Sequence, residues 1–205
     1  MLIESLKDQD SETKILEAAK TVFTRKGMDG ATMQEIADEA QISRTSLHYY
    51  FRNKEKLFEI IFAESLDRIT PRFNKIIEMP IPLFEKIELF VENYLTVLTD
   101  NPMLPGLIVH EMSRDPHAVF NIINTKGIKL DKLLVQIELE KMGGVLRNFP
   151  IEHFVVNIFS LCVFPFLAKP LLEEYLFDND ENKFLQFIEE RKKVISESII
   201  LFIKK

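Results

Sequence analysis

Residues 32–54, TMQEIADEAQISRTSLHYYFRNK, contain two short helix patterns joined by a tight turn, and this stretch decides the fold. Thr32 and Glu35 predict a capping box, in which each side chain bonds the backbone amide of the other residue. Ser43 has the residue type and position of an N-cap for the second helix. Because only residues 41–43 separate the two patterns, the helices must meet at a steep angle, as they do in a helix-turn-helix.

The second helix has an apolar side and a side suited to reading DNA. Leu47 and Phe51 are four residues apart, so they share one face and predict the inward contact. The remaining face carries a guanidinium, two hydroxyls, an imidazole and a phenol, all able to contact base edges in the major groove of double-stranded DNA. These candidate base-contacting residues are Arg44, Thr45, Ser46, His48 and Tyr49. Hydroxyl or ammonium groups that could hold phosphates are supplied by Thr32, Tyr50 and Lys54.

Charge is concentrated in a way that fits specific DNA binding. The whole chain has a net charge of −6, yet residues 43–56 hold four cations and only one anion, Glu55. A basic segment on an acidic chain argues against a general nucleic-acid coat, which would spread basic charge widely.

Composition and apolar runs indicate a protein of the reducing cytoplasm. A single cysteine in 205 residues excludes a disulfide framework. The first ten residues are too polar for a signal peptide. The longest uncharged run, residues 153–168, is shorter than the roughly 20 apolar residues that a membrane span needs.

Helix punctuation along the chain predicts an all-α protein with two domains. We expect a helix-turn-helix DNA-binding domain in residues 1–53 and a ligand-binding and dimerisation bundle in residues 54–205. No segment shows the period-2 alternation of a strand. Nine helices are expected, spanning about 11–26, 33–40, 44–50, 54 onward with a bend near 71, 82–99, 103–114, 115–143, 151–168 and 181–203.

Residues 13–58 resemble the N-terminal signature of the TetR family of bacterial transcriptional regulators. The resemblance rests on TKILEAAKTVFTRKGMDGAT and ATMQEIADEAQISRTSLHYYFRNKEKLF. It implies a homodimeric repressor that binds a palindromic operator, with the base and phosphate contacts at the positions named above. Two departures are Gln41, where the family usually has glycine at a turn that often needs positive φ, and His48, where tyrosine is common.

The C-terminal two-thirds is rich in phenylalanine, and most of these side chains are predicted to form core. The resemblance implies a cavity there for a small-molecule inducer, which this lining predicts to be apolar or aromatic. No other cofactor and no metal is expected, because no third ligand lies at suitable spacing from the histidines. Candidate ligand contacts, for each of which a structural role is favoured over ligand contact, are Phe62, Tyr94, His110, Phe120, Asn124, Asn157 and Cys162.

Two other classes of function, an enzyme and a structural protein, are alternatives to a DNA-binding regulator. A small helical enzyme would need a phosphate-binding loop, a nucleophile elbow or a His/Cys cluster, and the sequence has none of these motifs. A structural protein with a degenerate helix-turn-helix would lack donors on the groove face, whereas this chain has Arg44 and Lys54 there. We therefore expect no catalytic residues and favour a sequence-specific DNA-binding regulator.

Overall fold

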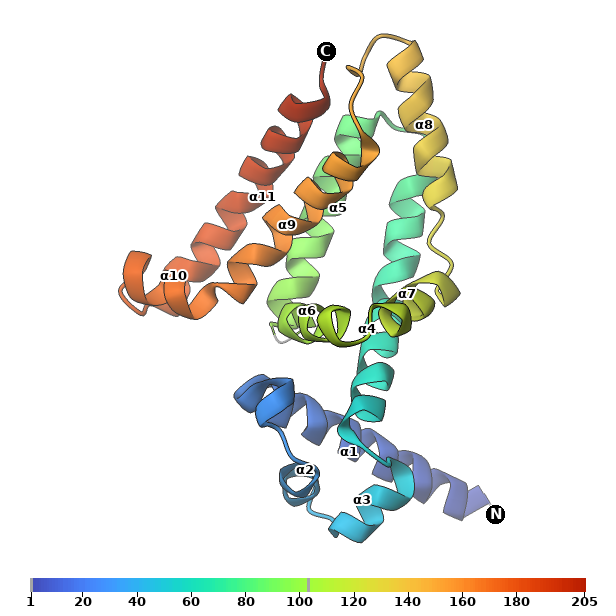
Figure 1. The fold of residues 1–205 in the computed structure, drawn as a ribbon, viewed down its shortest axis with the longest axis vertical. Helices are drawn as coiled ribbons and strands as arrows, with labels where there is room; N and C mark the ends of the chain where they lie inside the picture. The colour runs from blue at the N-terminus through green and yellow to red at the C-terminus, as the bar shows by residue number, and fades with distance from the viewer. Residues whose placement is uncertain (1, 103) are drawn as a thin grey trace. The chain divides into compact units, whose positions relative to one another are not determined.

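The computed structural model describes residues 2–102 and 104–205, which form eleven helices (Figure 1). This described part contains no strand, only an isolated antiparallel bridge between Leu146 and Lys204. The prediction of an all-α fold is confirmed. The expected count of nine helices is wrong.

Two helices are additional to the expected nine, and each arises beside a glycine or a proline. The expected helix over 115–143 is divided into α7, Pro116–Thr125, and α8, Leu130–Met142. Gly127 lies between them with φ of 67°, which is incompatible with a continuing right-handed helix. Pro170 lies in the first turn of a further helix, α10, Lys169–Leu176, where its missing N–H costs no hydrogen bond.

The N-terminal helices begin where their caps predict. Helix α1, Leu2–Gly30, is kinked at Gly27, whose φ is 71°. Before α2, Met33–Glu39, the Thr32 hydroxyl accepts from the Glu35 amide at 3.2 Å. The Glu35 carboxylate accepts from the Thr32 amide at 3.1 Å, which completes the capping box. Ser43 caps α3, Arg44–Tyr50, by accepting from the Ser46 amide at 3.0 Å.

The remaining helices lie close to their expected ranges. Helix α4 spans Lys54–Glu78 and continues through Pro71. The others are α5, Leu83–Asp100; α6, Leu104–Arg114; α9, Ile151–Leu167; and α11, Glu181–Ile203. Met103, the expected first residue of α6, lies outside the described residues. No single described helix is long and apolar enough to cross a membrane; α9 and α10 reach that length and composition only together, with a bend of 66°.

The helices form two compact units. The first unit joins Met1–Arg68 with Pro102–Thr125, and the second joins Ile69–Asn101 with Lys126–Lys205. Helix α4 contributes its first part to one unit and its last part to the other. The predicted boundary between residues 53 and 54 separates DNA binding from ligand binding, whereas these units are defined by packing. That functional boundary stays a prediction.

The first unit buries the apolar faces of α1, α2 and α3 against one another. Helix α1 packs on α2, α2 packs on α3, and α6 packs on α1. Side chains from each of the first three helices are completely buried, so the helix-turn-helix has a core of its own: Ile15, Ala19, Val22, Ile36, Ala37 and Leu47.

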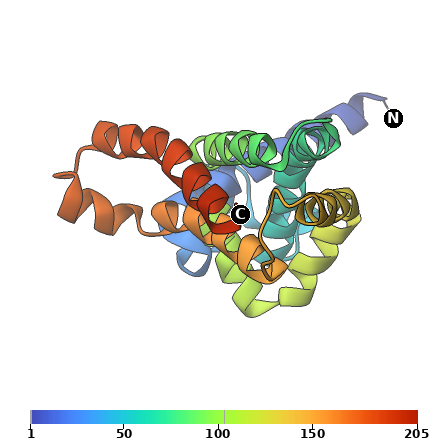
Figure 2. The same cartoon turned by 90° about the horizontal axis from the view of Figure 1, so that it is seen from above.

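The second unit is built on α5, α9 and α11, which lie side by side (Figures 1 and 2). A group of aromatic rings joins the end of α4 to α5 and α9. Phe73 and Phe90 have ring centroids 4.6 Å apart, and Tyr94 and Phe159 are 5.6 Å apart with edge-to-face rings. Such pairs add stabilisation beyond the area that they bury.

The turn between α2 and α3 provides a stability prediction. Gln41 has φ of 56°, a left-handed conformation that costs a side-chain-bearing residue about 1 kcal/mol. We therefore expect Gln41→Gly to raise the free energy of unfolding by up to about 1 kcal/mol in urea titrations. Ala40, with φ of −74°, is the matched control, and Ala40→Gly should destabilise the chain. Equal effects of the two glycines would contradict this account.

Candidate nucleic-acid interface

Helix α3 presents a polar face that no other part of its unit covers. Leu47 is completely buried, while Tyr49 on the opposite side is 81% exposed. Arg44, Thr45 and His48 are exposed as well. The structure thus brings the five predicted base-contacting residues onto one short helix, with the apolar side turned inward as expected.

At the start of α3, hydrogen bonds to Ser43 restrain Ser46, which was predicted from the sequence only as a base contact. The hydroxyls of Ser43 and Ser46 are 2.8 Å apart, and the Ser46 amide bonds the same Ser43 oxygen. The Ser46 hydroxyl therefore belongs to the helix cap. Arg44 forms no ion pair with any described residue, so its guanidinium is available to a ligand.

The end of α3 holds an aromatic pair and an oriented histidine. Tyr49 and Tyr50 lie edge to face, with ring centroids 5.2 Å apart. The Nδ1 atom of His48 lies 3.2 Å from the backbone oxygen of Arg52, just beyond the helix. Leu47 accepts a 2.8 Å hydrogen bond from the Phe51 amide, which closes the last turn.

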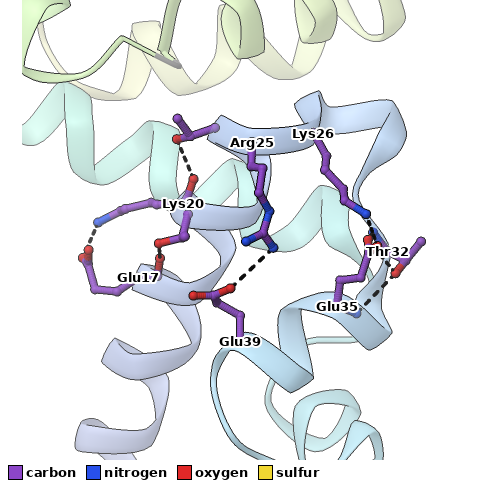
Figure 3. A network of polar contacts seen from close by, with 9 residues as sticks. Glu17, Lys20, Arg25, Lys26, Thr32, Glu35 and Glu39 are labelled. Carbon is purple, nitrogen blue, oxygen red and sulfur yellow. Dashed lines mark hydrogen bonds and ion pairs between the residues drawn. The ribbon is translucent and has the colours of Figure 1, made fainter.

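Thr32, a predicted phosphate contact, is part of a polar network (Figure 3). Its hydroxyl accepts from the Glu35 amide and donates to Glu35 Oε2 at 3.0 Å. Lys26 forms an ion pair with the same carboxylate. The hydrogen bonds from Lys26 and then from Thr32 lower the pKa of Glu35, so the capping carboxylate stays charged. Thr32 is held in place by groups of its own unit.

Lys54, the predicted cationic phosphate contact, is also engaged. Its Nζ atom donates to the backbone oxygens of Met28 at 2.7 Å, Ala31 at 3.2 Å and Asp29 at 3.3 Å. An ammonium group has three donors, so these carbonyls use all of them. Lys54 thereby joins the first residue of α4 to the end of α1 and to Ala31, which follows it. This role could not be predicted from the sequence, because carbonyl groups at a kinked helix end have no residue signature.

Two cations of α1 are paired with carboxylates. Arg25 Nη2 lies 3.4 Å from Glu39 Oε2, and Lys20 Nζ lies 2.7 Å from Glu17 Oε1 (Figure 3). Exposed pairs of this kind contribute little to stability. Their effect is to reduce the net positive charge that α1 and α2 offer to a phosphate backbone.

The predicted ligand contacts are divided between the two units. Phe62, His110, Phe120 and Asn124 belong to the first unit, and Tyr94, Asn157 and Cys162 belong to the second. Within the first unit, Phe62 is buried, Phe120 is 64% exposed and Asn124 is exposed. His110 Nδ1 lies 3.6 Å from Asp29 Oδ2.

In the second unit, Cys162 lies close enough to Tyr94 to influence the ionisation of its phenol. Burial raises the pKa of the Tyr94 phenol, and Cys162 acts in the same direction. Burial also raises the pKa of the Cys162 thiol to about 12, although Arg191 opposes this shift. Both groups are therefore neutral at physiological pH, and the thiol is not an activated nucleophile. Among the described residues no group of three or more His, Cys, Asp or Glu side chains could hold a metal.

Comparisons with known proteins agree with this geometry. Residues 15–61 match the model of the family described as bacterial regulatory proteins, tetR family. The probable HTH-type transcriptional regulator YttP of Bacillus subtilis (strain 168) is 25% identical over 176 residues, 82% of each chain. The HTH-type transcriptional regulator UidR of Escherichia coli (strain K12) is 34% identical over 131 residues, 62% of this chain and 64% of UidR.

A solved structure shows that the likeness extends to the whole fold. The ketosteroid transcriptional regulator KstR2 of Mycobacterium tuberculosis aligns with a TM-score of 0.70 over 95% of each chain. The sequence identity is 16%, so this comparison concerns the fold alone.

The contacts of Lys54 predict a loss of stability when its side chain is removed. Lys54→Ala leaves three carbonyl oxygens without their charged donor, and we expect the free energy of unfolding to fall by about 1–3 kcal/mol. Lys56→Ala is the matched control, because Lys56 is exposed and forms a surface ion pair with Glu59. Urea unfolding monitored by circular dichroism gives both values. If Lys54→Ala and Lys56→Ala unfold at the same urea concentration, the hydrogen bonds of Lys54 contribute nothing to stability.

Proposed function

The chain belongs to the tetR family of bacterial regulatory proteins, and we propose that it is a repressor that a small molecule releases from its operator. It is a DNA-binding transcriptional regulator, and the family is not one of enzymes. As its compartment we propose the cytoplasm, where the chromosome lies. The exposed face of α3 is the single observation that carries the DNA-reading role.

Each side chain on that face has a proposed part in recognition. Arg44 forms no ion pair within the described part of the chain and can fork onto guanine O6 and N7. Tyr49 offers an exposed ring to a thymine methyl or the sugar edge, while Thr45 and His48 offer hydrogen bonds to base edges. Ser46 contributes less, because its hydroxyl is shared with Ser43.

The phosphate contacts are proposed in a revised form. Tyr50 keeps its proposed contact, and Thr32 contributes at most its one remaining acceptor position, which a phosphate cannot use. Lys54 is reassigned from a phosphate contact to a positioning role, because its three donors already bond backbone carbonyls. The part of the DNA affinity that comes from phosphate contacts then depends on fewer residues than the family resemblance implies.

A homodimer is proposed because α9 and α11 leave an apolar surface uncovered in the single chain. Soluble monomers seldom expose large continuous apolar patches. Two copies could cover these faces by an isologous contact, which would present two α3 helices roughly 34–36 Å apart to a palindromic operator. The exposed apolar residues of the two helices are Val155, Val156, Phe159, Phe164, Leu167, Leu185, Val194 and Leu201.

The inducer is proposed to be an apolar or aromatic small molecule bound in the C-terminal bundle. The support is the aromatic group of Phe73, Phe90, Tyr94 and Phe159, in which the neutral Tyr94 phenol provides a polar group. A coupling free energy of about 1–3 kcal/mol between the two sites would suffice for regulation. Mass spectrometry of small molecules that co-purify with the chain, followed by operator titrations in their presence, tests this part.

The DNA-reading role predicts the effect of removing Arg44. Arg44→Ala should weaken operator binding by ~1–3 kcal/mol and relax the preference at one position of each half-site. Fluorescence anisotropy with DNA from upstream of the chain's own gene measures the affinity, and single-base operator variants measure the preference. Arg72→Ala, which removes an exposed arginine of α4 in the second unit, is the matched control. Equal binding by both variants would exclude Arg44 from the interface.

The dimer proposal predicts a change of mass when charge is placed on the apolar faces. Val156 and Leu201 are 62% and 74% exposed, so Val156→Glu with Leu201→Glu should leave the fold intact and yield a monomer. Leu134→Glu, at a 45% exposed position of α8, should leave the dimer unchanged. Light scattering at micromolar concentration without DNA distinguishes the two masses. A monomeric wild-type chain would contradict the proposal.

A further inference from the structure

The hydrogen bond at the end of α3 determines which nitrogen of His48 is an acceptor. Nδ1 lies 3.2 Å from the backbone oxygen of Arg52. A carbonyl oxygen only accepts, so Nδ1 must carry the hydrogen. A neutral imidazole has one N–H, which leaves Nε2 of the exposed ring as a hydrogen-bond acceptor.

From this geometry we propose that His48 is a specificity-determining residue that selects a base with an exocyclic amine. In the major groove, adenine N6 and cytosine N4 are donors that an Nε2 lone pair can accept from. Guanine O6 and thymine O4 are acceptors, which an unprotonated Nε2 repels. The inference rests on the proposed function, since it requires α3 to lie in the groove.

The charged groups around His48 are either cations or already engaged by other residues. On its own segment the charged neighbours are Arg44 and Arg52, both cations. The carboxylates of α2, which packs on α3, are engaged by other side chains, and so are the charged groups in the first turn of α4. These pairs are Glu35 with Lys26, Asp38 with Gln34, Glu39 with Arg25, Lys56 with Glu59, Lys54 with backbone carbonyls, and Glu55 electrostatically with Arg114.

The first test is selection of bound duplexes from a random-sequence DNA library at about pH 8.5, where imidazoles are neutral. We expect the wild-type chain to enrich adenine or cytosine at one position of each half-site. His48→Ala should lose the preference at that position alone. His117→Ala, which removes another exposed histidine, should keep it. Guanine or thymine at the His48-dependent position, or an unchanged motif in His48→Ala, would overturn the inference.

The second test removes the amine from the DNA and needs no variant of the protein. In the selected duplex the adenine is replaced by purine, or the cytosine by 2-pyrimidinone, each of which lacks only the amino group. We expect the wild-type affinity to fall roughly threefold to tenfold, the size of one hydrogen bond. His48→Ala should be indifferent to the same replacement, which isolates the pair. An unchanged wild-type affinity refutes the amine contact.

If no sequence is enriched in the first test, the proposed DNA-reading function itself fails, and that result differs from a motif that ignores His48.

Discussion

The orientation of the exposed polar face of α3 depends on the burial of Leu47. Leu47 is completely buried with Ile36 and Val22, so α3 can sit on its unit in only one rotational setting. A rotation that freed Leu47 would forfeit roughly 1.5–3 kcal/mol of apolar burial. Because side chains on a helix are fixed relative to one another, this one anchor determines that Tyr49 and Arg44 face outward. The specificity of the molecule thus begins in its hydrophobic core.

Polar contacts then fix the segments that the core cannot reach. The carbonyls of residues 28, 29 and 31 lie where α1 is kinked and ends, and backbone oxygens in such places need donors. Lys54 supplies three donors from the first residue of α4, and Glu35 with Thr32 supplies the cap of α2. Residues that look like phosphate contacts in the sequence therefore act first as internal supports. A recognition helix can be held rigidly only if its neighbours are held in this way.

The caps and apolar spacing made the helix-turn-helix predictable, because both are local signals. Thr32 and Ser43 each act within one turn of their own position, and the spacing of Leu47 and Phe51 is a pattern of one turn. The division of 115–143 was not predictable, since it depends on the positive φ of Gly127, and glycine occurs in many conformations. Long-range pairings such as Lys86 Nζ to Gln136 Oε1, 2.6 Å apart across fifty residues, leave no trace in a periodic pattern. The bond that orients His48 spans only four residues, but its acceptor is a backbone oxygen, which no residue type reveals.

The pairing of cations has a consequence for how this chain can find its operator. Non-specific binding comes from counterions that lysines and arginines release from phosphates. Here Lys20, Lys26 and Arg25 are paired with carboxylates, and the donors of Lys54 are engaged by carbonyls, while the chain as a whole carries −6. We therefore expect random DNA to be held weakly. A larger share of the operator affinity must come from base-edge contacts of α3, and each such contact then discriminates more strongly between sites.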